Sequence, residues 1–163
     1  MLTYIVAFLM SLAVAAATTP LLARFALARG WVDQPVGGRK IHRRAIPRVG
    51  GIAVALAFFA PLLALGLYTN EVSQLLYSNT RPFLAFSLGA LAILGLGVYD
   101  DLKGASPKQK LLVQCLVSIG LWWVGFRIDL LGNPFGATLE LGAWSLPLTV
   151  LWLVGVTNAM NLI

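Results

Sequence analysis

The chain has 163 residues, of which 59% are hydrophobic and 11% are charged, and its mean hydropathy is +0.84. A soluble domain of this length needs more polar surface, so the composition excludes a soluble globular protein and indicates an integral membrane protein. The net charge of +6 does not by itself indicate nucleic-acid binding, because basic residues also accumulate in the cytoplasmic loops of membrane proteins.

Five apolar runs approach the roughly 20 residues that a helix needs to cross a bilayer. They occupy residues 3–23, 50–68, 82–99, 110–126 and 145–163. Their hydrophobicity is continuous rather than alternating, so the sequence predicts an all-α polytopic membrane protein with about five transmembrane spans. The first run is too long for a signal peptide, and we expect it to be retained as a span. No linker or repeat divides residues 1–163, which indicates a single membrane domain.

The basic residues are distributed unevenly over the four intervening loops. Ten of the twelve lysines and arginines flank the first loop, residues 24–48, or the third, residues 100–109. The positive-inside rule therefore predicts that these loops are cytoplasmic and that the amino terminus lies outside. The outer loop at 127–144 has Gly-Asn-Pro and Gly-Ala turn signals between short alternating runs, which predicts a small β-hairpin on the membrane.

The third run ends in two adjacent acids, Asp100 and Asp101, in a chain with only six carboxylates. At the carboxyl end of a helix each negative charge opposes the helix dipole by a few tenths to about 1 kcal/mol. A solvated helix end is the alternative interpretation. The pattern favours a bound Mg²⁺, with Mn²⁺ as an alternative, because Mg²⁺ takes one or two carboxylates and adds water and substrate phosphates.

The first loop contains the dense stretch DQPVGGRKIHRRAIPRVGG, from Asp33 to Gly51. Lys40 is a candidate phosphate ligand there, and so is Arg48, which precedes a helix amino terminus whose free N–H groups attract anions. A loop that only sets topology is the alternative, as is a glycine pair that serves helix packing. His42 alone is a weak candidate, since a histidine in a basic loop is more often a polar surface residue.

More polar residues lie at the predicted cytoplasmic ends of the last two runs. Lys110 and Gln114 share one helix face, although Lys110 would equally snorkel to the interface, and Asn158 and Asn161 share another. Amides in a span line a cavity or bond another helix, and we expect no partner for the two asparagines in the other four runs. These polar residues all converge on the cytoplasmic face, which predicts an anion-handling site.

Two classes of function fit such a site. One is an enzyme that transfers a phosphoryl group between a soluble nucleotide substrate and a lipid. The other is a transporter or channel subunit with a polyanion-binding inner vestibule, although these runs have few of the mid-membrane ionisable or helix-breaking residues that transporters show. Nucleic-acid binding is disfavoured, because the basic residues flank the runs and form no separate domain.

Three segments resemble the polyprenyl-phosphate N-acetylhexosamine-1-phosphate transferases of glycosyltransferase family 4, in family order and at plausible spacings. They are DQPVGGRKIHRRAIPRVGG, GVYDDLKGASPKQKLLVQ and GVTNAMNLI, and the first and last are closer to the WecA and TagO branch than to the MraY branch. The resemblance implies transfer of a hexosamine-1-phosphate, with GlcNAc-1-phosphate as the first expectation, from a UDP-sugar to undecaprenyl phosphate, releasing UMP. It implies an Mg²⁺-dependent enzyme at the cytoplasmic face of the bacterial plasma membrane, catalysing the first membrane step of cell-wall or surface polysaccharide synthesis.

The resemblance also assigns roles to residues. It makes Asp100 and Asp101 the catalytic acid pair, in which one acid deprotonates or orients the lipid phosphate and the other helps to hold the metal, in an order that stays open. It places a second set of residues in substrate-binding motifs: Lys40, His42, Lys110, Asn158 and Asn161. Arg48 joins this set as a candidate because it precedes the predicted anion site at a helix amino terminus. The implied partners are a UDP-sugar, polyprenyl phosphate and the lipid bilayer, without nucleic acid, and a homodimer stays open.

The sequence departs from the family pattern at its end. The family continues the last motif with Asp-Gly, whereas this sequence stops at Ile163. We therefore expect the amino-terminal half of a larger transferase domain, inactive on its own, in which the choice of UDP-sugar cannot be read.

Overall fold

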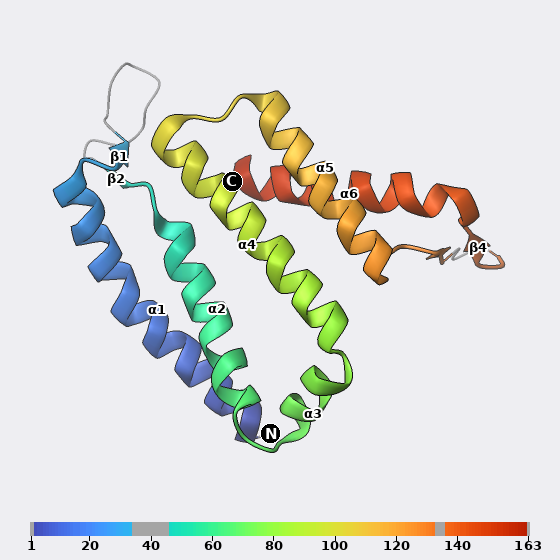
Figure 1. Ribbon diagram of the computed structural model, residues 1–163, viewed down its shortest axis with the longest axis horizontal. Helices are drawn as coiled ribbons and strands as arrows, with labels where there is room; N and C mark the ends of the chain where they lie inside the picture. The colour runs from blue at the N-terminus through green and yellow to red at the C-terminus, as the bar shows by residue number, and fades with distance from the viewer. Residues whose placement is uncertain (1, 34–45, 133–135, 163) are drawn as a thin grey trace. The chain divides into compact units, whose positions relative to one another are not determined.

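The computed structural model describes residues 2–33, 46–132 and 136–162 (Figure 1). Its helices are α1 (Leu2–Arg29), α2 (Gly50–Gly66), α3 (Glu71–Ser78), α4 (Thr80–Lys103), α5 (Pro107–Val124) and α6 (Ser145–Leu162), with a short 3₁₀ helix η1 (Gly142–Trp144). The chain forms two compact units. The first unit comprises residues 1–78 and 97–104, and the second comprises residues 79–96 and 105–163. Helix α4 therefore contributes to both.

Three stretches of the described chain are long and apolar enough to cross a membrane: α1, α4 and residues 142–160, which hold η1 and most of α6. Helices α2 and α3 pass the same test only as a pair, bent by 97°, which makes four candidate spans if the pair is one span. Helix α5 lies at the predicted fourth run but is not among them. The helical membrane architecture is confirmed, whereas the count of five spans stays a prediction.

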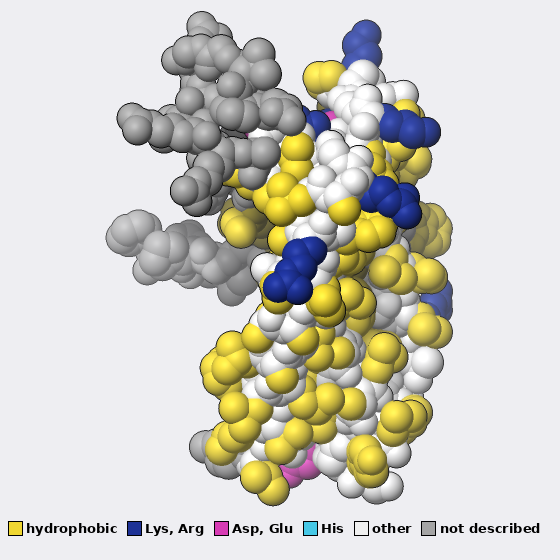
Figure 2. All heavy atoms as spheres, turned by 90° about the vertical axis from the view of Figure 1, so that its left-hand side faces the viewer, with side chains coloured by type: hydrophobic (Ala, Val, Ile, Leu, Met, Phe, Trp, Pro, Cys, Tyr) yellow, Lys and Arg dark blue, Asp and Glu magenta, His cyan; other side chains and the backbone are white. Residues whose placement is uncertain are grey.

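The surface of these helices is apolar, as expected for side chains that face lipid. Figure 2 shows the face on the α1 side, where hydrophobic side chains cover most of the surface. Many large side chains on the candidate spans are exposed, including Phe8 at 65% and Leu88 at 67%. In water such a surface would be an aggregation hazard, whereas in a bilayer it is the natural exterior.

In the first unit, α1 packs along α2 and ends in a glycine cap. Gly30 takes φ +72°, a left-handed conformation that favours glycine. Its N–H donates to the Leu27 carbonyl at 3.2 Å, and the Trp31 N–H donates to the Ala26 carbonyl at 2.8 Å. This is the Schellman pattern, completed by the contact of Trp31 with the Phe25 ring at 5.4 Å. After this cap the chain continues directly into the first loop.

Two short strands close that loop at its base. Strand β1 (Val32–Asp33) pairs antiparallel with β2 (Ile46–Pro47), with Val32 opposite Pro47 and Asp33 opposite Ile46. The sequence analysis did not predict this ribbon, because two-residue strands carry no periodicity of their own. The pairing brings the two ends of segment 34–45 together.

The predicted second loop, residues 69–81, is wrong in part, because helix α3 occupies most of it. Asn70 makes the 97° bend between α2 and α3. Its Nδ2 donates to the carbonyls of Leu65 and Tyr68, each at 2.8 Å, and its Oδ1 accepts from the N–H groups of Val72 and Ser73 at 2.9 and 3.0 Å. One amide therefore satisfies the end of α2 and caps the start of α3, since it carries both donors and acceptors.

In the second unit, the sequence delimits α5 with strong signals. Ser106 accepts a hydrogen bond from the Gln109 N–H while the Gln109 side chain accepts from the Ser106 N–H, which is a capping box, and Pro107 occupies the first turn. Gly125, at φ +114°, ends the helix. Between α5 and α6 the buried side chains are polar: Gln114, Ser118, Ser145 and Thr149. Polar contacts between apolar-surfaced helices are typical of membrane proteins.

The predicted hairpin at 127–144 is confirmed as an antiparallel pair. Strand β3 (Leu130–Leu131) pairs with β4 (Leu139–Glu140). Polar bonds fix the hairpin base to the start of α6: Ser145 donates to the Asp129 carboxylate and accepts from the Trp122 indole, each at 2.9 Å. The Ile128 N–H donates to the Thr149 hydroxyl at 2.9 Å. The location of the hairpin on the membrane stays a prediction.

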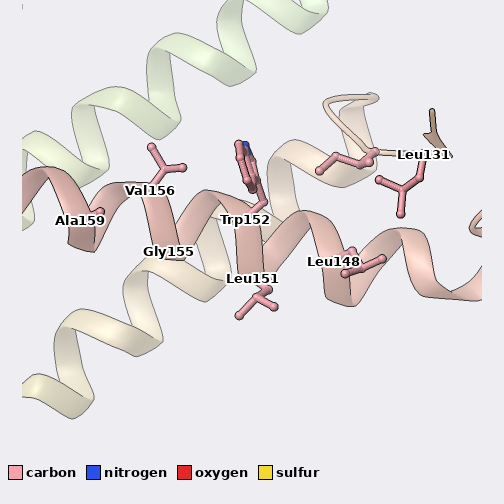
Figure 3. Close-up of a pocket in the computed structure, with 8 residues that line it drawn as sticks. Leu131, Leu148, Leu151, Trp152, Gly155, Val156 and Ala159 are labelled. Atoms are coloured by element: carbon pink, nitrogen blue, oxygen red, sulfur yellow. The ribbon is translucent and has the colours of Figure 1, made fainter. Parts of the chain in front are cut away.

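An apolar groove of about 360 Å³ lies between this hairpin and one side of α6. In Figure 3 it is lined by Leu131 and by α6 side chains, among them Leu148, Trp152 and Val156. The lining is almost wholly hydrocarbon, and the Trp152 indole carries the one nitrogen among the side chains drawn in Figure 3.

Candidate functional site

The acid pair lies inside the last turn of α4, which runs four residues beyond the predicted apolar run, from 99 to Lys103. Gly104 then takes φ +75° and its N–H donates to the Asp100 carbonyl at 2.9 Å, which ends the helix. Asp100 and Asp101 are each partly buried. The Lys103 ammonium lies 5.9 Å from the Tyr99 ring centroid. Both acids therefore occupy the helix end where the dipole opposes negative charge.

Arg48 supplies positive charge at this helix end. Its Nη1 donates to the backbone carbonyl of Asp101 at 3.1 Å, and its Nη2 forms a salt bridge of 2.6 Å with Asp33 Oδ1. Its backbone N–H donates to the Trp31 carbonyl at 3.1 Å, so the arginine extends from the β1–β2 base. The protein itself thus places a guanidinium against the Asp101 peptide, from a residue 53 positions away in sequence.

The sequence predicts an anion site at the start of α2 with the Arg48 side chain beside it, but that side chain has other partners in the structure. Gly50 and Gly51 open the helix and are exposed, and Val49 before them gives no side-chain cap. The Arg48 side chain instead bonds two protein oxygens, the Asp101 carbonyl at the end of α4 and the Asp33 carboxylate in β1. Lys40 and His42 lie outside the described residues.

A second polar group lies between α5 and α6. Asn158 Nδ2 donates to Gln114 Oε1 at 2.7 Å, and Gln114 Nε2 donates back to Asn158 Oδ1 at 3.5 Å. Asn158 Nδ2 also donates to the Val154 carbonyl at 2.8 Å. The prediction that Asn158 has no partner in the other runs is wrong, because Gln114 supplies a matching amide from α5. Gln114 is only 7% exposed and Asn158 is partly buried, so the pair is a largely sheltered interhelical link.

Two further predicted residues belong to the same helices. Lys110 is partly buried in the first turns of α5, one helical turn before Gln114, and its N–H donates to the Ser106 carbonyl at 3.1 Å. Asn161 is in the last turn of α6, and its side chain lies outside what the structure describes. The structure thus links Asp33, Arg48 and Asp101 in one unit and Gln114 with Asn158 in the other.

Comparison with known proteins places the chain among membrane transferases. Residues 83–163 match the family model described as Glycosyl transferase family 4. The whole chain aligns at 41% identity with a Bacillus subtilis protein named "Probable undecaprenyl-phosphate N-acetylglucosaminyl 1-phosphate transferase". The chain belongs to glycosyl transferase family 4.

Two other family relatives are similar over most of the chain. A Thermotoga maritima protein named "Undecaprenyl-phosphate alpha-N-acetylglucosaminyl 1-phosphate transferase" is 30% identical over 89% of the chain. A Yersinia pestis protein of the same name is 33% identical over 86%. The chain spans 43%, 40% and 36% of the lengths of these three relatives. No solved structure matches the chain.

The family match covers the acid pair, Lys110, Asn158 and Asn161, which all fall within residues 83–163. The first loop, with Lys40, His42 and Arg48, precedes it but lies within the full-length similarity to the Bacillus subtilis relative.

The donor set at the end of α4 fits the Mg²⁺ that the family resemblance implies. Magnesium needs only one or two carboxylates and completes its shell with water and substrate phosphates, so two neighbouring acids suffice. Within the described ranges, no group of three or more His, Cys, Asp or Glu side chains forms a metal cage. The chemistry of this helix end therefore suits a substrate-bridged magnesium ion better than a closed zinc-type site.

Two residues that take part in the contacts described above, Asp33 and Gln114, are not predicted from the sequence to do so. The sequence predicts no role for Asp33 beyond the start of a motif, although an acid among five cations is the natural ion partner of one of them. It predicts that Gln114 shares a face with Lys110 and does not predict the bond to Asn158. An amide in an apolar helix was the available signal, because such a group needs a partner on another helix.

Proposed function

We propose that this protein transfers GlcNAc-1-phosphate from UDP-GlcNAc to undecaprenyl phosphate and releases UMP. The observation that carries the proposal is the acid pair at the end of α4, held beside a cation, in a chain 41% identical over its whole length to a relative named for this reaction. Residues 1–163 would supply one part of the transferase domain.

The reaction is a phosphoryl-type transfer in which no redox change occurs. An oxygen of the lipid phosphate attacks the phosphorus that carries the sugar, and the bond from that phosphorus to the bridging oxygen breaks. The electron pair leaves with UMP, and the product is a lipid pyrophosphate bearing GlcNAc. Positioning and neutralisation of charge provide most of the catalysis in such transfers.

The acid pair has the properties that this step needs. One carboxylate of Asp100 and Asp101 accepts the proton of the lipid phosphate or orients it, and the other contributes to holding Mg²⁺. When bound, Mg²⁺ would neutralise charge on the pyrophosphate. Cationic and amide side chains would bind the substrate phosphates and sugar nucleotide: Lys40, His42, Lys110, Asn158 and Asn161.

The proposal includes a membrane arrangement. The chain would cross the bacterial plasma membrane about five times with its amino terminus outside, which places the acid pair at the cytoplasmic face, where nucleotide sugars are made. The excess of lysine and arginine in loops one and three supports this orientation.

The test uses the purified full-length protein that the native gene encodes, in detergent with undecaprenyl phosphate, and measures the products of the transfer. UDP-GlcNAc labelled separately in uridine and in sugar should give soluble UMP and an organic-extractable sugar lipid in equal amounts. Omission of the lipid phosphate should abolish both. UDP-GalNAc, offered in parallel at the same concentration, tests the choice of sugar, and a chelator followed by Mg²⁺ or Mn²⁺ tests the metal requirement.

A second assay, with the protein reconstituted in sealed vesicles, separates the enzyme from the transporter alternative. In sealed vesicles, uptake of labelled UDP-sugar without any lipid product would favour transport and overturn the proposal. Activity with chelator present and no divalent ion would contradict the proposed magnesium role alone.

A further inference from the structure

The guanidinium of Arg48 joins two parts of the first unit that are distant in sequence. One Nη atom bonds the Asp33 carboxylate in β1, and the other bonds the carbonyl of Asp101 in the last turn of α4. The backbone of Arg48 is itself fixed to Trp31, next to the glycine cap of α1. The arginine therefore links the end of α1 and the β1–β2 base to the peptide unit that carries Asp101.

The bond to Asp101 satisfies a group that the helix leaves open. The last four carbonyls of an α-helix lack intrahelical partners. The Asp100 carbonyl is taken by the N–H of Gly104 at 2.9 Å, and Arg48 bonds the next carbonyl along. A cation bonded there also opposes the negative end of the helix dipole, directly beside two carboxylates. The contact therefore joins the backbone of the acid pair to an arginine that is itself ion-paired with Asp33.

We propose that Arg48 is a positioning residue for the acid pair, acting through the Asp101 peptide, and that Asp33 holds Arg48 in this orientation. The proposal rests on the proposed function for the meaning of the acid pair. It assigns the two Nη groups to protein oxygens, in place of the substrate phosphate that the sequence analysis assigned to Arg48.

The exposure of the pair favours positioning over a contribution to stability. The side chains of Arg48 and Asp33 are 42% and 31% exposed. Ion pairs that accessible contribute little to the stability of a fold, because water and salt screen them. A planar guanidinium can bond two acceptors in fixed directions, whereas an ammonium is a point charge that does not reproduce this geometry. Lysine at position 48 is therefore the discriminating replacement.

The kinetic test compares Arg48→Lys, Asp33→Asn and the double variant in the UMP-release assay, with Arg29→Lys as the matched control. Arg29 lies in the same unit, with its guanidinium 4.9 Å from the Phe25 ring centroid. We expect each single variant to lower kcat by roughly 10- to 100-fold with KM for the UDP-sugar within about twofold, since small misplacement of catalytic groups costs this much. The double variant should have a kcat no lower than either single variant, because both substitutions disrupt the same connection from Asp33 through Arg48 to Asp101.

Hydrogen–deuterium exchange gives a readout that does not depend on activity. In the absence of substrate, Arg48→Lys and Asp33→Asn should both speed exchange in peptides covering residues 100–106, where the Gly104 N–H reports the helix end. Exchange in α6 should stay at the wild-type rate, which shows that the protein remains folded. Arg29→Lys should leave exchange at 100–106 unchanged.

The outcomes separate the two proposals. If the two variants change hydrogen exchange as described but the wild-type protein releases no lipid-dependent UMP, the proposed function is overturned. Unchanged exchange at 100–106 in both variants would overturn the positioning role, whatever the activity. A raised KM for either substrate with unchanged kcat in Arg48→Lys, without effect of Asp33→Asn, would make Arg48 a substrate ligand and would also overturn it.

Discussion

The side-chain amides of Gln114 and Asn158 bond each other in both directions, at 2.7 and 3.5 Å, and so link α5 to α6. Each helix presents mostly hydrocarbon to its surroundings, and the contact joins a buried Gln114 to a partly buried Asn158. Asn158 has its second N–H bonded to its own helix at Val154. The pair thus fixes how α5 and α6 cross, one turn from Lys110 on one helix and from Asn161 on the other.

Gln114→Leu should destabilise the protein, because it leaves the Asn158 amide without its partner in an apolar setting. Interhelical hydrogen bonds in membrane proteins average about 0.6 kcal/mol and reach about 1.7 kcal/mol, so we expect a loss in this range in detergent unfolding. A double-mutant cycle with Asn158→Leu should recover most of the loss as coupling energy. Gln74→Leu, at an exposed position of α3, serves as the control. Strict additivity of Gln114→Leu and Asn158→Leu would contradict the pairing.

The bend between α2 and α3 should depend on both ends of the Asn70 amide. Asn70→Asp keeps the oxygens that cap α3 but loses the N–H groups that bond the Leu65 and Tyr68 carbonyls. We therefore expect faster hydrogen exchange at 65–69 with protection of α3 retained. Asn70→Ala should loosen both segments and cost about 1 kcal/mol or more, as N-cap losses do. Identical exchange patterns in the two variants would show that the amide does not connect the helices.

Membrane orientation can be read with single cysteines in a Cys115→Ala background. With the amino terminus outside, cysteine at position 140 should react with an impermeant thiol reagent in intact cells. Cysteine at position 40 should react only after permeabilisation. Reaction at position 40 in intact cells, with none at 140, would reverse the topology and move the acid pair to the outer face.

Hydrophobicity alone was enough to predict where the long helices lie, because the bilayer requires long apolar segments and satisfied backbone groups. It failed at α3, since an eight-residue helix depends on a cap, Asn70, and not on a long apolar run. The β1–β2 ribbon and the Arg48 contact with Asp101 are set by tertiary pairing across the chain, which no local pattern encodes. The acid pair itself was identifiable because its position on a helix is electrostatically unfavourable without compensation. The direction of that compensation, from Arg48, required the structure.

We propose that Asp100 and Asp101 perform the transfer. Asparagine at either position keeps the size of the side chain and removes its charge, so the helix end should fold while proton acceptance and metal binding are lost. Glu140→Gln, in the exposed strand β4, is the control for loss of one carboxylate.

The decisive measurement is therefore lipid-dependent UMP release by Asp100→Asn and Asp101→Asn, each compared with Glu140→Gln at matched amounts of folded protein. Loss of charge stabilisation and of general-base catalysis each cost about 10²-fold or more. We predict that turnover falls by at least two orders of magnitude in both aspartate variants and stays at the wild-type level in the control. Turnover within a few-fold of wild type in both aspartate variants would contradict the account.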